Sequence, residues 1–176
     1  YWCAGAGQSG FDGFGRIVSG EANPSGRLVD TFVYDLTKAP TWNNMGEFEY
    51  TNMSDFKVDA TAFSPETQPT FVNYVEGIYV GYKFYETAAT EGLIDYDKTV
   101  QYPFGYGLSY STFEQKIVNS STEGDTVTLT VEVKNTGSVA GKDVVEVYFT
   151  PPYTNGGIEK ASVNLIDYAK TGEIAP

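Results

Sequence analysis

Residues 126–134, TVTLTVEVK, alternate strictly between apolar and polar side chains. Val127, Leu129, Val131 and Val133 fall on one face, and threonine, glutamate and lysine fall on the other. A period of two predicts a β-strand with one buried face. The rest of the chain must therefore supply partner strands and an apolar layer that covers this face.

Two further strands are predicted downstream of this segment. The sequence DVVEVYFTPP at 143–152 predicts one strand that ends at its proline pair, and SVNLIDYAKT at 162–171 predicts another. Short strands at this spacing are typical of an antiparallel β-sandwich. Because the chain stops at Pro176, we expect the final strands of the sandwich to lie elsewhere in a longer polypeptide.

The first part of the chain has a mixed pattern. Residues 11–19 carry apolar side chains at helical spacing, and Gly20 suits a helix C-cap. The run Asn-Pro-Ser-Gly at 23–26 predicts a turn, followed by a short strand over 27–33. Residues 35–70 have weak periodicity and predict a long ordered loop region, a kind of segment that is often functional.

The segment VNYVEGIYVGYKFYET at 72–87 is dense in β-branched and aromatic side chains, which favour strands. It also carries Glu76 and Lys83, which we expect to form a structural ion pair. The composition predicts a buried strand, with core positions at Val75, Ile78, Val80, Tyr82 and Phe84.

Composition excludes several classes of function. The net charge of −12 repels phosphate backbones, so nucleic acid is not an expected partner. No apolar run approaches the roughly 20 residues of a membrane span, so no membrane partner is expected. The chain has no histidine and a single cysteine, which excludes histidine-dependent catalytic triads and Cys-cluster zinc sites within it. We expect no metal or other cofactor, and no feature indicates a compartment.

Residues 5–10, GAGQSG, match the dinucleotide fingerprint G-x-G-x-x-G. A dinucleotide site also needs an acidic residue about 20 positions on, at the end of the next strand. Asp30 lies at about this distance but inside the predicted strand, and no further βαβ units follow. We therefore interpret the glycines as a strand–turn–helix junction, and a dinucleotide enzyme is the least favoured function.

Five stretches, taken in order and spacing, resemble glycoside hydrolase family 3, the β-glucosidase and β-xylosidase family. They are AGQSGFDGFGRIVSGEANPSGRL (6–28), YVEGIYVGYKFYET (74–87), YPFGYGLSYSTFE (102–114), VKNTGSVAGKDVVEVYFTPP (133–152) and SVNLIDYAKT (162–171). The resemblance implies an α/β region followed by an all-β region. Residues 1–110 would form the C-terminal part of an α/β sandwich domain. Residues 111–176 would form part of a fibronectin type III-like antiparallel β-sandwich.

The resemblance also implies a function. The chain would be a segment of a retaining, exo-acting β-glycosidase that hydrolyses O-glycosidic bonds at the ends of oligosaccharides. Its partners would be the glycoside substrate and the missing barrel domain of the same polypeptide. That barrel carries the family's nucleophilic aspartate, and the usual acid/base lies upstream, so this segment alone is expected to be inactive. The alternative is a non-catalytic carbohydrate-binding or scaffolding module.

The loop TWNNMGEFEYTNM at 41–53 contains the candidate substrate-proximal residues Trp42, Glu47, Phe48 and Glu49. Aromatic faces stack on sugar C–H surfaces, and carboxylates accept hydrogen bonds from hydroxyls, so this loop could border a sugar pocket. The interpretation that we favour is that its aromatic residues anchor a long loop to the core. A catalytic pair is not expected here, because alternate residues of an extended segment share one side and cannot flank a glycosidic bond.

Overall fold

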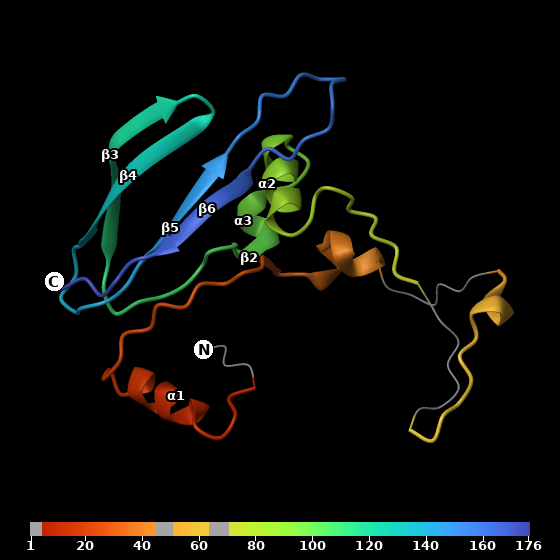
Figure 1. Cartoon of the computed structure of the whole chain (residues 1–176), viewed down its shortest axis with the longest axis horizontal. Helices are drawn as coiled ribbons and strands as arrows, with labels where there is room; N and C mark the ends of the chain where they lie inside the picture. The colour runs from red at the N-terminus through yellow and green to blue at the C-terminus, as the bar shows by residue number, and fades with distance from the viewer. Residues whose placement is uncertain (1–4, 45–50, 64–70) are drawn as a thin grey trace. The chain divides into compact units, whose positions relative to one another are not determined.

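The computed structural model describes residues 5–44, 51–63 and 71–176 (Figure 1). The chain divides into two compact units, and each is described by itself. Unit 1 consists of Tyr1–Val29, Phe104–Phe149 and Leu165–Pro176, and unit 2 of Asp30–Pro103 and Thr150–Asn164. None of the helices in the described ranges is long and apolar enough to cross a membrane.

Unit 1 begins with the glycine-rich segment, which forms a turn that leads directly into helix α1, Gly10–Val18. The backbone amides of Ser19 and Gly20 donate to carbonyls of the last turn. Gly20 has a φ of +81°, a left-handed conformation that glycine adopts without strain. The predicted helix and its end are therefore confirmed.

Two antiparallel strands of unit 1 confirm the alternating pattern. Strand β4, Thr126–Asn135, pairs with β3, Phe113–Glu123, in a register that is shifted between Ile117 and Asn119. The side chains of Leu129, Val131 and Val133 are half-buried between exposed polar neighbours, whereas Val127 is exposed. Strand β3 was not predicted, because its second half, NSSTE, carries no apolar side chain.

The other predicted strands are also present. Strand β5, Val144–Phe149, and strand β6, Asn164–Lys170, form a second two-stranded sheet. Their arrows run in opposite directions in Figure 1. The chain is thus a small mixture of helices and antiparallel sheets, as the coarse fold class predicted.

The predicted turn at 23–26 is wrong, because these residues form neither a turn nor any other regular element. An Asn turn needs a local hydrogen bond from the side chain to the nearby backbone. Instead, the Asn23 side chain accepts from the Ser109 hydroxyl at 2.9 Å and from the Tyr110 amide at 2.8 Å. It also donates to the Ala140 carbonyl at 3.0 Å, so it ties distant segments of unit 1 together.

Unit 2 consists of short elements. Strand β1 spans only Phe32–Val33 and pairs with β2, Val100–Tyr102, so the strand predicted over 27–33 is mostly wrong. The described part of the expected loop region contains three short 3₁₀ helices: η1, Leu36–Lys38; η2, Pro40–Asn43; and η3, Met53–Phe56. Two α-helices follow, α2 at Tyr82–Thr90 and α3 at Tyr96–Thr99.

The buried strand predicted within 72–87 is wrong, because Tyr82 onwards forms helix α2. Tyr85 and Ala88 lie three residues apart and are 3% and 5% exposed, so a helical face supplies the core of unit 2. The expected core positions Val75, Ile78 and Val80 are exposed. Strand propensity reports how a side chain fits a half-buried sheet surface. Here the helix buries Tyr85 and leaves Tyr82 and Phe84 half-buried.

The predicted ion pair between Glu76 and Lys83 is also wrong. Glu76 is buried in the turn before α2, and its Oε2 atom has no hydrogen-bond partner in the described structure. Lys83 belongs to the first turn of α2, and no ion pair joins it to Glu76. The change from strand to helix between the two residues removes the extended geometry that the prediction assumed.

Candidate functional site

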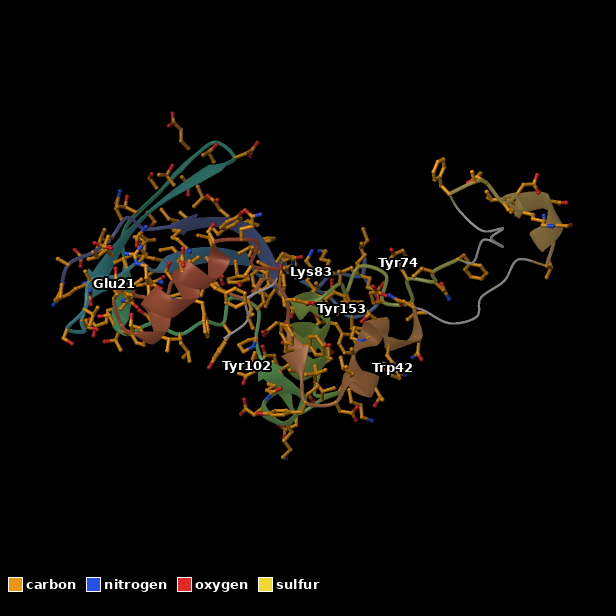
Figure 2. All side chains as sticks on the ribbon, turned by 90° about the horizontal axis from the view of Figure 1, so that it is seen from below. Glu21, Trp42, Tyr74, Lys83, Tyr102 and Tyr153 are labelled. Carbon is orange, nitrogen blue, oxygen red and sulfur yellow. The ribbon has the colours of Figure 1, made fainter. Side chains whose placement is uncertain are left out.

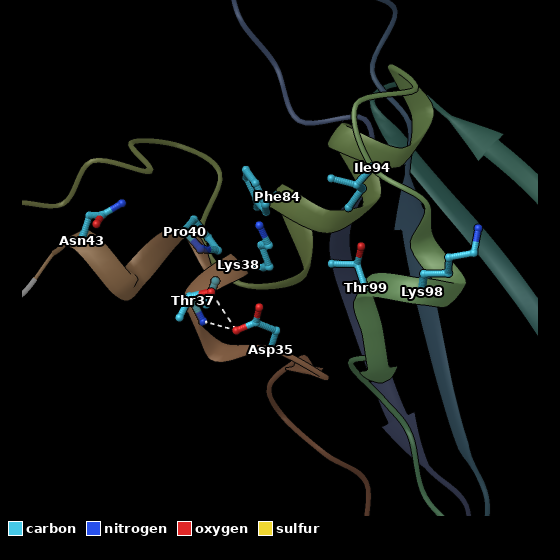
Figure 3. A pocket seen from close by; sticks show the side chains of 10 residues that line it. Asp35, Thr37, Lys38, Pro40, Asn43, Phe84, Ile94, Lys98 and Thr99 are labelled. Carbon is cyan, nitrogen blue, oxygen red and sulfur yellow. Dashed lines mark hydrogen bonds between the residues drawn. The ribbon is translucent and has the colours of Figure 1, made fainter.

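An open cavity of about 680 Å³ lies in unit 2 (Figure 3). Its volume falls within the range of about 300–1,000 Å³ that is usual for small-molecule sites. Residues of η1, η2, α2 and α3 and of the adjoining loops line it: Asp35, Thr37, Lys38, Ala39, Pro40, Asn43, Phe84, Ile94, Lys98 and Thr99. Polar and apolar side chains therefore face the same space.

Asp35 is held at the edge of this cavity by backbone and side-chain hydrogen bonds. The Tyr34 amide donates to the Thr99 carbonyl at 3.1 Å, which brings the start of η1 beside the end of α3. The Asp35 carboxylate then caps η1, accepting from the Thr37 hydroxyl at 2.7 Å and the Thr37 amide at 3.0 Å. These two hydrogen bonds, the hydroxyl first, lower the pKa of Asp35 and keep it ionised.

The two lysines of the cavity differ in their surroundings. Lys98 forms an ion pair with Asp95 at 2.6 Å, and its side chain extends away from Asp35 (Figure 3). That contact raises the pKa of Lys98 and lowers the pKa of Asp95. Lys38 instead extends toward the ring of Phe84. The cavity therefore combines an ammonium group, a carboxylate and an aromatic ring.

This arrangement suits binding rather than glycoside cleavage. Among the described residues that line the cavity, Asp35 alone carries a carboxylate. A retaining glycosidase needs two carboxyl groups about 5–5.5 Å apart on either side of the bond. Across residues 5–44, 51–63 and 71–176, no group of three or more His, Cys, Asp or Glu side chains is placed to hold a metal ion.

Of the residues predicted to border a sugar pocket, Trp42 is the one that the structure describes. It lies on η2, between Pro40 and Asn43, which line the cavity, and its own side chain is 54% exposed (Figure 2). Glu47, Phe48 and Glu49 lie outside the described residues. The Trp42 side chain is therefore about half exposed, and the part that is exposed is accessible to a ligand.

The sequence analysis missed Asp35, Lys38 and Phe84. One local signal was available for Asp35, because Asp-Leu-Thr places a capping carboxylate two residues before a hydroxyl. Phe84 was assigned to a strand, so its position on helix α2, where it lines the cavity, was not predicted. Nothing local to Lys38 indicates that it extends toward that ring.

Asn44 fixes the end of η2 to the segment that precedes α2. Its side chain is 4% exposed, and its Oδ1 atom accepts from the Val75 amide at 3.1 Å. Its carbonyl accepts from the Asn73 amide at 3.0 Å. The helix that carries Trp42 is therefore held at its C-terminal end by a buried amide side chain.

Substituting Asn44→Ala should loosen this attachment. The Val75 amide loses one of its two acceptors and keeps the Asn73 carbonyl at 2.9 Å. The expected loss is about 0.5–1 kcal/mol, and the hydrogen exchange of this amide should accelerate about threefold. Exchange monitored by NMR for Asn43→Ala, an exposed neighbour, should match the unsubstituted chain. Equal protection of Val75 in both variants would contradict the role given to Asn44.

The chain is similar in sequence to known proteins. No protein-family model matches the chain. A β-glucosidase from Ruminococcus albus is 36% identical over 170 residues, an alignment that covers 97% of this chain and 15% of the relative. The chain therefore spans a small part of the curated relatives that it matches.

Solved structures of β-glucosidases are also similar to nearly the whole of this chain. β-Glucosidase 3B from Thermotoga neapolitana, solved with glycerol, has a TM-score of 0.73 and 35% identity, over 97% of this chain and 20% of that one. A GH3 β-glucosidase from Bifidobacterium adolescentis has a TM-score of 0.69 and 29% identity, over 96% of this chain and 20% of its own. The similarity thus extends to the arrangement of the elements.

Proposed function

Because this chain is similar over nearly its whole length to one segment of the β-glucosidases of glycoside hydrolase family 3, we propose that it acts within a larger retaining β-glycosidase. The alignment with the Ruminococcus albus β-glucosidase, 36% identical across 97% of the chain, is the observation that carries this proposal. The enzyme would be exo-acting and would release glucose or xylose from oligosaccharide ends. Relatives named as glycosidases do not favour the alternative of a non-catalytic module.

The domain assignment forms part of the proposal. Residues 1–110 would complete an α/β sandwich domain, and residues 111–176 would begin a fibronectin type III-like domain. The order of elements supports this division, because the three α-helices described all precede residue 110 and strands β3 to β6 all follow it. The antiparallel pairing of β3 with β4 is also what such a sandwich requires.

In this enzyme the segment would support substrate binding and would not supply the catalytic pair. The nucleophilic aspartate and the acid/base would come from other parts of the polypeptide, and the loop at 41–53 would border the sugar. Trp42 would stack on a sugar ring, with Glu47 and Glu49 accepting hydrogen bonds from hydroxyls and Phe48 adding apolar surface. The exposed indole of Trp42 and its firm attachment through Asn44 support this role.

Substituting Trp42→Ala in the polypeptide encoded by the native gene tests this role. Loss of about 1 kcal/mol of stacking should raise KM for an oligosaccharide by about fivefold, with kcat nearly unchanged. That split is expected because a contact outside the reaction centre stabilises substrate and transition state equally. Leu36→Ala, an exposed residue of η1, is the matched control and should leave both constants unchanged.

Two outcomes would count against the proposal in different ways. If Trp42→Ala leaves KM unchanged while the enzyme hydrolyses aryl β-glycosides, Trp42 does not contact the sugar, and the role proposed for the loop is wrong. If the unsubstituted polypeptide hydrolyses no β-glucoside and no β-xyloside, the proposed activity itself fails.

A further inference from the structure

A second cavity of unit 2, with a volume of about 570 Å³, lies between helix α2 and the segment that connects β5 to β6. We call it the tyrosine cavity. Its lining residues are Tyr79, Thr87, Thr90, Glu91, Thr150, Pro151, Pro152, Tyr153, Lys160, Ala161 and Ser162. Neither the candidate site described above nor the proposed function uses any of them.

Hydrogen bonds hold the walls of the tyrosine cavity in place. The Ser162 amide donates to the Thr87 hydroxyl oxygen at 3.0 Å, joining the connecting segment to α2. The Tyr79 hydroxyl donates to Glu159 Oε1 at 3.1 Å. The Lys160 ammonium donates to a backbone carbonyl of the proline pair at 2.7 Å, which closes the segment on itself. These hydrogen bonds fix the segments that form the walls of the cavity.

The side chains around this cavity form two chemically different surfaces. The ring of Tyr153 is 51% exposed and continues the apolar surface of Pro151 and Pro152. Thr90 and Glu91, at the end of α2, supply a hydroxyl and an exposed carboxylate. A ligand must therefore present an apolar face to one surface and hydrogen-bonding groups to the other.

The protonation state of Tyr79 and the negative charge of the chain limit which ligands the cavity can bind. Partial burial, and after it the neighbouring Glu159 carboxylate, raises the pKa of Tyr79, so its hydroxyl stays protonated at neutral pH. The described wall carries one carboxylate, Glu91, and one ammonium group, Lys160, which already donates to the Pro152 carbonyl. The two charges offset each other, and the net charge of −12 of the whole chain disfavours anionic ligands. A neutral pyranose chain meets these conditions, because its rings have C–H faces for stacking and hydroxyls around the edge.

We propose that the tyrosine cavity binds neutral gluco-oligosaccharides, with Tyr153 stacking on a sugar ring and Glu91 accepting hydrogen bonds from its hydroxyls. The choice of glucose units rests on the proposed function, whereas binding itself requires no hydrolysis. A proline-rich peptide is the less suitable occupant, because such peptides dock in grooves lined mainly by aromatic side chains. Here threonine, serine and glutamate make up much of the wall.

Titration of the ¹⁵N-labelled 176-residue chain with cellotriose, followed by NMR, tests this proposal. Saturable amide shifts are expected at Tyr79, at 87–91 and along 150–162. Tyr153→Ala should weaken the apparent affinity by about tenfold, since the stacking contact is lost. Tyr168→Ala, which removes an exposed tyrosine from β6, is the matched control and should leave the affinity unchanged.

Glu91→Gln provides a second test that preserves the shape of the side chain and the fold. It should weaken binding severalfold, because an amide oxygen is a poorer acceptor than a carboxylate. The proposal is overturned if cellotriose produces no saturable shifts, or if both tyrosine variants lose affinity equally. It is also overturned if a proline-rich peptide shifts these amides and cellotriose does not. If the 176-residue chain binds cellotriose but the polypeptide encoded by the native gene hydrolyses no β-glucoside and no β-xyloside, the proposed function fails and this inference stands.

Discussion

Asp143→Ala should lower the free energy of unfolding of unit 1 by about 3 kcal/mol or more. Asp143 is 7% exposed, and its Oδ1 atom accepts from Arg27 Nη2 at 2.8 Å. Its Oδ2 atom accepts from Gln115 Nε2, also at 2.8 Å. The substitution leaves the largely buried Arg27 guanidinium without its carboxylate, and a charge out of water without its partner is strongly unfavourable.

Urea unfolding of the chain, followed by circular dichroism, measures this effect. The matched control is Glu21→Ala, which breaks the Arg16–Glu21 ion pair of the same unit. That pair has a similar distance, 2.9 Å, but both side chains are more than half exposed, so the expected loss is below about 0.5 kcal/mol. Similar losses in the two variants would show that burial does not determine the contribution of the Arg27–Asp143 pair.

Asn135→Asp should destabilise unit 1 by about 3 kcal/mol with almost no change in side-chain size. The buried Asn135 amide donates to the carbonyls of Val139 at 2.8 Å and Ile174 at 3.0 Å. Its Oδ1 atom accepts from the Ser111 hydroxyl at 2.6 Å and the Gly137 amide at 3.0 Å. In the variant an oxygen faces the two carbonyl oxygens, so two buried acceptors lose their donor and repel the new atom.

The same unfolding experiment can be applied to Asn119→Asp, which makes the identical chemical change at an exposed position of β3. A change within about 0.5 kcal/mol is expected there, because water can solvate the new carboxylate. If Asn135→Asp is as stable as Asn119→Asp, the four hydrogen bonds do not contribute as the structure indicates.

The parts of the fold that could be predicted are those with a strong local period. Strand β4 alternates apolar and polar residues along its sequence, and α1 repeats apolar residues at helical spacing. Strand β3 has no such period, and its pairing with β4 determines its conformation. Helix α2 was assigned to a strand, because its tyrosines and phenylalanine favour strands until the burial of Tyr85 and Ala88 is known.

The candidate site was less predictable than the fold, because distant pairing assembles it. Trp42 was identified from its residue type and its irregular surroundings. Asp35 and Thr99 meet only because β1 pairs with β2, and no local pattern indicates that register. The same holds for the contacts of Asp143 with Arg27 and of Asn135 with Ile174, which join residues far apart in the sequence. The type of a single polar residue does not predict which distant residues it will hydrogen-bond.

Trapping of the glycosyl–enzyme intermediate tests most directly whether this chain is a non-catalytic segment of a retaining β-glycosidase. The polypeptide encoded by the native gene would be incubated with a slowly turned-over fluorinated β-glucoside, digested, and mapped by peptide mass spectrometry. Retaining enzymes form a covalent sugar ester on a carboxylate. We expect the adduct on an aspartate outside residues 1–176. An adduct on a carboxylate within these residues, or hydrolysis that inverts the anomeric configuration, would contradict the account.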